Sequence, residues 1–205
     1  RLPIGVIAIL IGLLTLPSAV SGAKSYSADR FDVDVAVQED GSLLVTETVI
    51  FRFSGGPFTY VFRDLPTDHT DGVSVESATM DGQVLPPGKN AGQVEISGRS
   101  TVKVRWHFAP TSDAVHTFIL AYRVMGVIRV SPDADLLVWQ ALPDDYDYPI
   151  ASSTITVTYP KAIQRMAVPR LRAGDASMET GDGQVRFVVQ NLEPESPLVL
   201  ELGFA

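Results

Sequence analysis

Apolar and polar residues alternate along much of this chain, which is the pattern of β-strands with one buried and one exposed face. Apolar side chains occupy every second position from Phe31 to Val37, and a second β-rich run covers residues 43–53. The turn residues Gln-Glu-Asp-Gly at 38–41 lie between the two runs. The pattern therefore predicts a β-hairpin over residues 31–53.

A second hairpin is predicted over residues 73–85, because Asp81-Gly82 is a strong turn signal between two β-rich runs. Further strands are predicted at 93–97, 101–108, 115–124, 154–159, 184–190 and 198–204. Beyond the N-terminal segment, no stretch shows sustained helical spacing of apolar residues. We expect an all-β fold, an antiparallel β-sandwich of immunoglobulin-like or related type, forming one domain over 24–205 with a weak seam near residue 160.

The N-terminal segment has the layout of a secretory signal peptide. Arg1 precedes an apolar run over 4–16, and Ser21-Gly22-Ala23 fits a small-x-small cleavage site. The run is short for a membrane span, which needs about 20 residues. We therefore expect residues 1–23 to be a signal peptide, with an uncleaved anchor as the alternative, and residues 24–205 to be exported.

Composition narrows the function classes. The 205 residues include no cysteine, which excludes disulfides, zinc–thiolate sites and cysteine nucleophiles within this sequence. The formal net charge is −8, with no Lys/Arg cluster, which argues against nucleic acid as a partner. No cofactor-binding or catalytic motif is present, so we expect no cofactor and no enzyme.

Arg63 is an unusual residue in the stretch YVFRDLP, a predicted strand that ends at Leu65-Pro66. It could bind an anionic group of a peptide or an envelope polymer. Alternatively, Glu47 could hold it, because Glu47 has the same strand parity as Val45 and Val49 on an otherwise apolar face. A buried glutamate normally has a partner, so the pattern favours an internal Arg63–Glu47 pair.

Two other groups of residues suggest sites. His107 and His116 flank a predicted hairpin with its turn at Thr111-Ser112, which would place them opposite each other across the strands. A zinc site needs three or four protein ligands, so a polar cross-strand pair is the favoured interpretation.

The other group is an acidic loop predicted over 133–147, with carboxylates at Asp133, Asp135, Asp144, Asp145 and Asp147. It could bind calcium, although the spacing of a calcium loop is absent. With Trp139 and nearby tyrosines, Asp144, Asp145 and Asp147 could also form a sugar-binding or glycosidase cleft. A solvated loop, with Trp139 in the core, is the simpler interpretation.

Three patches together resemble the N-terminal, extracytoplasmic domain of the DUF2207 family of predicted bacterial membrane proteins. They are DVDVAVQEDGSLLVTETVIFRF at 32–53, GGPFTYVFRDLP at 55–66, and LAYRVMGVIRVSPDADLLVWQALPDDYDYPI at 120–150. The resemblance implies an exported β-rich domain on the outer face of the cell membrane, tethered by helices outside this chain, and it implies no reaction. Gln140 stands where the family often has Asn, and Tyr146 stands where a second Trp is common.

The leading expectation is therefore a non-enzymatic module that contacts a protein or an envelope polymer. The alternative is a carbohydrate-binding or glycoside-hydrolase-like domain that uses the loop 133–148. A structural spacer is the third candidate.

Overall fold

The computed structural model describes residues 23–130, 132, 135–160, 169–181 and 183–204. Within these ranges the protein forms strands joined by turns and loops, so the all-β prediction is confirmed. No helix among the described residues is long and apolar enough to cross a membrane. The predicted signal peptide lies almost wholly outside the described residues.

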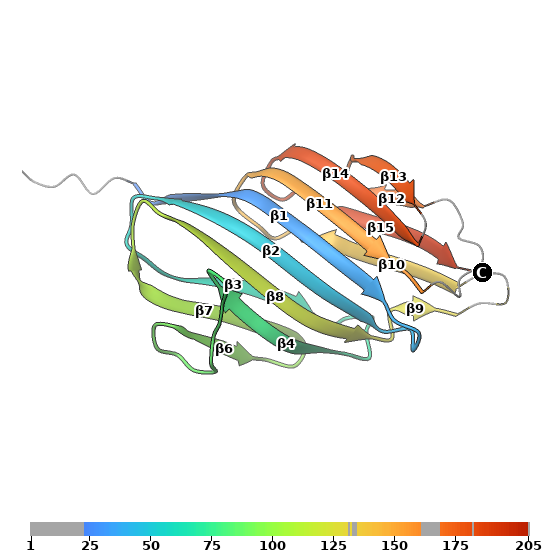
Figure 1. Ribbon diagram of the computed structural model, residues 1–205, viewed down its shortest axis with the longest axis horizontal. Coiled ribbons are helices and arrows are strands. Elements are labelled where there is room, and N and C mark those ends of the chain that lie inside the picture. Colours follow the sequence, from blue (N-terminus) through green and yellow to red (C-terminus); the bar gives the residue numbers. More distant parts are fainter. Residues whose placement is uncertain (1–22, 131, 133–134, 161–168, 182, 205) are drawn as a thin grey trace, which may run out of the picture.

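The largest sheet has eight strands, several of which are long and lie side by side in Figure 1. In chain order they are β1 (Ser25–Val37), β2 (Leu43–Ser54), β4 (Gly72–Met80), β5 (Gln83–Val84), β8 (Val115–Met125), β11 (Ile150–Thr158), β13 (Ser177–Gly181) and β14 (Gln184–Leu192). Their order across the sheet is β13-β14-β11-β1-β2-β8-β4-β5.

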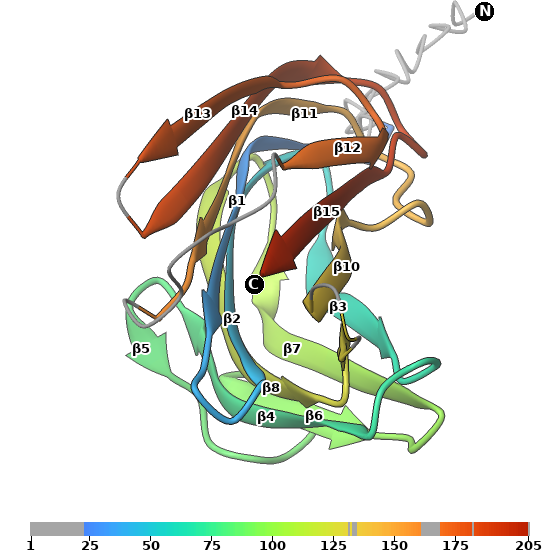
Figure 2. The same cartoon turned by 90° about the vertical axis from the view of Figure 1, so that its right-hand side faces the viewer.

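Two smaller sheets complete the fold. One contains β3 (Phe58–Pro66), β7 (Thr101–Thr111) and β6 (Gln93–Ser97), in that order. The other contains β12 (Arg170–Ala173), β15 (Leu198–Phe204), β10 (Asp135–Leu142) and β9 (Ile128–Arg129), in that order. Figure 2 shows that the large sheet is curved and that β3, β7, β10 and β15 lie on its concave side.

The core fills the space between the large sheet and the smaller ones. Strand alternation sends Phe31, Val33 and Val35 of β1 inward, and each is at most 1 % exposed. Between the layers, the rings of Trp106 on β7 and Phe118 on β8 meet edge to face with 5.9 Å between their centroids. Because each fully buried large apolar side chain contributes about 1.5–3 kcal/mol, this core accounts for much of the stability without disulfides.

The hairpins predicted over residues 31–53 and 73–85 are confirmed. In the first, β1 pairs with β2 from Ser25↔Ser54 to Val37↔Leu43, so β1 begins earlier than the alternating pattern suggested. In the second, β4 and β5 are joined at Asp81-Gly82, where both φ angles are positive, as a tight hairpin turn requires.

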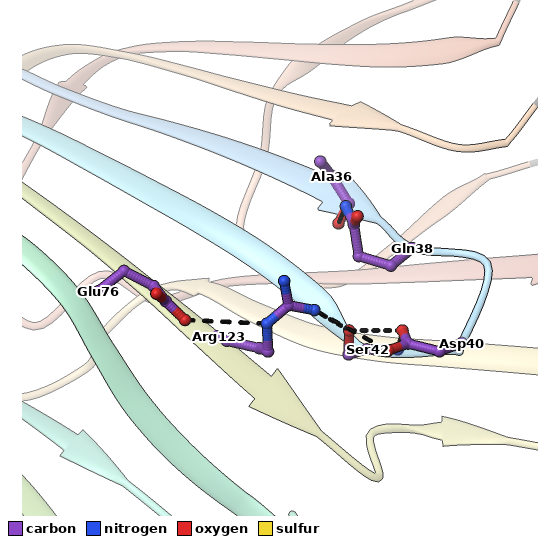
Figure 3. A network of polar contacts seen from close by, with 6 residues as sticks. All are labelled: Ala36, Gln38, Asp40, Ser42, Glu76 and Arg123. Carbon is purple, nitrogen blue, oxygen red and sulfur yellow. Dashed lines mark hydrogen bonds and ion pairs between the residues drawn. The ribbon is translucent and has the colours of Figure 1, made fainter.

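A polar network holds the turn between β1 and β2, as Figure 3 shows. The Ser42 backbone N–H and hydroxyl donate to Asp40 Oδ1 at 2.9 and 2.6 Å, and Arg123 Nη1 donates to Ser42 Oγ at 2.7 Å. Arg123 also approaches Glu76 on β4 at 3.8 Å. The hydrogen bonds from Ser42, with the charge of Arg123, lower the pKa of Asp40.

Three features differ from the sequence predictions. The large sheet is mixed rather than antiparallel, because β1 and β11 pair in parallel, with Val33 opposite Ile155. The predicted β7–β8 hairpin is wrong, because these strands belong to different sheets. The segment 133–147 is not a loop throughout, because residues 135–142 form β10.

The strands that follow residue 160 join sheets that contain earlier strands. β14 pairs with β11, and β15 pairs with β10. Both sheets therefore extend across the seam predicted near residue 160. The short strands β12 and β13 were not predicted.

Candidate functional site

Arg63 lies on β3, where alternation gives its side chain the same inward direction as those of Val61 and Leu65. Its Nε donates to Glu47 Oε2 at 2.8 Å, and its Nη2 donates to Glu47 Oε1 at 3.0 Å. Its Nη1 donates to the backbone oxygen of Asp64 at 2.7 Å. The expected Arg63–Glu47 contact is thus present as a two-point ion pair, the geometry that suits a guanidinium best.

The pair is buried and has a third member. The Glu47 side chain is 3 % exposed and the Arg63 side chain is 17 % exposed. The Tyr122 hydroxyl on β8 donates to Glu47 Oε1 at 2.8 Å. Burial by itself would lower the pKa of Arg63, but the charge and hydrogen bonds of Glu47 outweigh it and raise that pKa. Burial and the charge of Glu47 raise the pKa of Tyr122, so its hydroxyl stays a donor.

A groove runs along β3 and has Arg63 in its wall. It consists of two adjoining parts, with volumes of about 300 and 360 Å³. Arg63, Asp64, Pro143 and Asp145 line both parts. Successive residues of β3 line the groove over its whole length, whereas no β7 residue does so among the described residues. The groove therefore follows the edge of β3 that pairs with no strand in the described part of the chain.

Aromatic side chains line the end of the groove near the start of β3. The rings of Tyr26 and Tyr148 lie 5.3 Å apart, and Tyr26 also meets Phe58 edge to face. The Tyr26 hydroxyl donates to Asp147 Oδ1 at 2.5 Å. Burial, followed by this hydrogen bond, raises the pKa of Tyr26. Lys24 closes this end, with its ammonium 5.5 Å from the centre of the Phe58 ring.

The acidic residues of the predicted loop separate in the structure. Asp144, Asp145 and Asp147 are exposed, and each lines part of the groove. Asp135 instead begins β10, opposite Phe204 of β15, and Asp133 lies outside the described residues. The structure thus brings together only the second half of the predicted acidic segment.

Trp139 is on β10 and lines the larger of the two parts of the groove. It is partly buried against the core rather than wholly within it. Its Nε1 is buried and has no hydrogen-bond partner among the described residues. A buried indole N–H normally finds an acceptor, so this donor is an unusual feature of the groove wall.

The two histidines expected to face each other lie in different sheets. His107 is opposite Gln93 and Tyr60, and its Nε2 lies 3.5 Å from Glu95 Oε2. His116 is opposite Phe51 of β2 and contacts Asp81 at 2.7 Å. Local alternation places each residue on a strand, but it does not indicate which sheet the strand joins. No group of three or more potential metal ligands gathers within the described ranges.

Sequence reasoning missed two parts of the site. Tyr122 has the same buried parity as Leu120 and Val124, and a tyrosine there needs an acceptor, which could have indicated Glu47. The exposed aromatics of β3, Tyr60 at 49 % and Phe62 at 61 %, gave no signal because β3 was not recognised as an edge strand.

Comparison with known proteins gives a fold and a family. A sequence search of curated proteins finds no match to this chain. The structure resembles yeast LTA4 hydrolase, solved in complex with bestatin, with a TM-score of 0.62 at 12 % identity, over 87 % of this chain and 28 % of that one. It also resembles an M1 zinc metallopeptidase from Deinococcus radiodurans, with a TM-score of 0.53 at 15 % identity, over 87 % and 42 % of the two chains.

The chain thus spans less than half the length of these enzymes, and at such identities the likeness concerns the fold alone. The profile of a family described as predicted membrane protein (DUF2207), N-terminal domain, matches residues 27–204. This match includes all three patches that resemble the family, and nearly all of the described chain. The protein therefore belongs to the DUF2207 family of predicted membrane proteins.

Proposed function

We propose that this chain is the extracytoplasmic, non-catalytic binding module of a membrane-tethered protein, and that it holds a protein or envelope-polymer partner in the groove along β3. In this proposal residues 1–23 direct export, and helices elsewhere in the protein provide the tether. The large sheet and the two smaller sheets act as the layers of a sandwich that present the groove. Membership of a membrane-protein family supports the tethering.

The observation that carries the proposal is the groove itself. Its walls combine apolar and aromatic side chains with several charged groups, so a partner could be held both by packing and by ion pairs. Its central arginine is held by Glu47, so Arg63 is positioned rather than mobile. Exposed aromatics on β3, next to the groove, add the kind of surface that partners recognise.

A hydrolase is the second candidate, because the similar solved structures include a hydrolase and a metallopeptidase. Asp144, Asp145 and Asp147 would then be its acidic groups. Against it, these carboxylates are exposed, whereas a catalytic acid usually has a pKa raised by burial. The expected result is no hydrolysis of peptides or cell-wall glycans by the wild-type chain. Turnover that the Asp145→Asn variant abolishes would favour the hydrolase.

Because this sequence contains no cysteine, its location can be tested with a single introduced one. A single cysteine at exposed Asp34, on β1, is treated in intact cells with a membrane-impermeant maleimide. The unsubstituted protein is the matched control for labelling at any other site. Labelling in intact cells is expected, and labelling that requires lysis would contradict the extracytoplasmic location.

Binding can be tested with a photo-crosslinking amino acid at Phe62, in the full-length protein in its own cells. The same amino acid at Asp34, which is exposed on the other side of the large sheet, is the matched control. We expect a discrete adduct from position 62 and none from position 34. Equal patterns from both positions would show that the groove has no partner.

A further inference from the structure

The groove lies between two strand edges that belong to different sheets. β3 is the first strand of its three-stranded sheet, and no strand pairs with its outer side among the described residues. β10 has β15 on one side, and on the other side β9 reaches only Leu136 and Leu137. Val138, Trp139 and Gln140 of β10 therefore face the groove beside an edge that no described strand pairs with.

The directions of the backbone N–H groups on β3 can be worked out from the residues at and just after its C-terminal end. The N–H of Thr67 donates to the carbonyl of Ser100 at 3.1 Å, so this position faces β7. Pro66, which has no N–H, takes the opposite direction, where a proline is tolerated on an edge strand. Since these directions alternate along a strand, the N–H groups of Phe62 and Asp64 point away from β7 and toward the groove.

One side chain of the groove wall, that of Arg63, offers further donors. A guanidinium has five N–H groups, and Arg63 uses three in its contacts with Glu47 and Asp64. The Nε1 of Trp139 has no acceptor within the described part of the chain. Because the Trp139 Nε1 is buried, a carbonyl-rich backbone placed in the groove would meet the remaining N–H groups of Arg63 and those of the β3 edge.

The charge of the groove walls indicates which kind of extended segment could bind there. The carboxylates that line the groove are Asp64, Asp68, Asp144, Asp145 and Asp147. The cations are Lys24, Arg63 and Arg129. Glu47 balances Arg63, and Lys103 pairs with Asp64 at 3.1 Å. The remaining charged groups of the groove are four carboxylates and two cations, so its surface is acidic, in keeping with the net charge of −8. An occupant with lysine or arginine complements this charge.

We propose that the groove binds an extended, lysine- or arginine-bearing segment of another protein, which adds as a strand to the free edge of β3 and lies between β3 and β10. The added strand would connect the two smaller sheets across the concave side of the large one. Its inward side chains would be apolar and would pack on the groove floor, and its outward basic side chains would meet Asp144 and Asp145. The inference rests on the proposed function, because it specifies the partner of the same groove.

Strand addition has a signature that ordinary groove binding lacks, because it depends on the main-chain N–H groups of β3. Phe62→Pro removes one of these N–H groups at a position where an edge strand tolerates proline. Phe62→Ala removes nearly the same side-chain atoms and keeps the N–H, so it is the matched control. The probe is a phage-displayed library of random peptides about ten residues long, since β3 has nine residues. The library is selected on the whole chain.

We expect selected peptides to alternate apolar and basic residues and to bind wild type and Phe62→Ala with similar affinity. Phe62→Pro should weaken binding roughly tenfold, the usual effect of one lost main-chain hydrogen bond that leaves its acceptor buried. On wild type, the bound peptide should slow hydrogen exchange at the Phe62 and Asp64 amides. This measurement is independent of whether the proline variant folds.

Several results would overturn the inference. They are a library that yields no binder, binders rich in Asp and Glu, or binders that leave the Phe62 and Asp64 amides unprotected. A chitin oligosaccharide that protects the groove while peptides do not would assign it to a polysaccharide. Crosslinking from position 62 distinguishes a failure of this inference from a failure of the proposed function. A discrete adduct without peptide binding would refute strand addition but would still support the proposed binding module.

Discussion

Removing the guanidinium of Arg63 is expected to destabilise the fold far more than removing an ordinary surface arginine. In Arg63→Met, the long apolar side chain keeps much of the packing, but Glu47 remains buried, with the Tyr122 hydroxyl as its only hydrogen-bond donor from another side chain among the described residues. Breaking a buried pair by removing one member costs about 3–5 kcal/mol, because it leaves an uncompensated charge. Glu47 at 3 % exposure satisfies that condition, and Arg63 at 17 % exposure nearly does.

The double variant Arg63→Met/Glu47→Leu should lose much less than the sum of the single variants. It contains neither charge, and its main defect is the Tyr122 hydroxyl without its acceptor, worth about 1–3 kcal/mol. The cycle therefore predicts a coupling free energy of about 3 kcal/mol or more, above the range of most neighbouring pairs.

Urea denaturation followed by tryptophan fluorescence measures these free energies, because Trp106 is buried in the core. Arg52→Met, on the same strand as Glu47, is the matched control, since the Arg52–Asp29 pair is exposed and should be worth about 1 kcal/mol or less. Additive losses in the cycle, or an Arg63 effect no larger than that of Arg52, would refute the buried-pair reasoning.

Three further predictions follow from other sites. Because the pKa of Tyr122 is raised in the fold, the folded protein keeps a proton that the unfolded chain releases above about pH 10. The free energy of unfolding should therefore fall above that pH by about 1.4 kcal/mol per pH unit for this group, and it should fall less steeply in Tyr122→Phe. Unchanged slopes in alkaline urea titrations would contradict this. The lowered pKa of Asp40 contributes stability that is present above the unfolded-state pKa and is lost as the pH falls through the folded-state pKa. Asp40→Asn should therefore lose less stability than wild type on acidification. Equal losses of the two proteins in acid denaturation would contradict this. Gly98→Ala places a Cβ against the carbonyl oxygen of Thr101 at a φ of +88°, so thermal unfolding should show a loss of about 1–3 kcal/mol, and an unchanged midpoint would refute the strain.

The sequence was most informative where a signal is local. Alternation located β1 and β2, and the same parity placed Glu47 on a buried face, which correctly indicated its contact with Arg63. Asp81-Gly82 identified its hairpin because few residues other than glycine, asparagine and aspartate adopt positive φ at both turn positions. These signals depend only on neighbours in the sequence.

What the sequence could not reveal depends on contacts between distant segments. The strand at residues 135–142 was hidden because its apolar residues run continuously and do not alternate, and acidic residues flank it. β7 and β8 were taken for a hairpin because they follow each other, yet the chain passes from one sheet to another between them. The groove was not foreseen, because its walls come from β3, β10 and the segment 143–148, which meet only in the folded protein.

The parallel pairing of β1 with β11 has a consequence for the timing of folding. Thr154 N–H donates to the Asp32 carboxylate across 122 residues of chain, and these strands lie in the middle of the largest sheet. Contacts of such high sequence separation are slow to form. If the chain crosses a membrane N-terminus first, β1 emerges long before the strand that must cover its second edge. Until then β2 can pair with only one side of β1, so the exposed edge would need protection from aggregation during export.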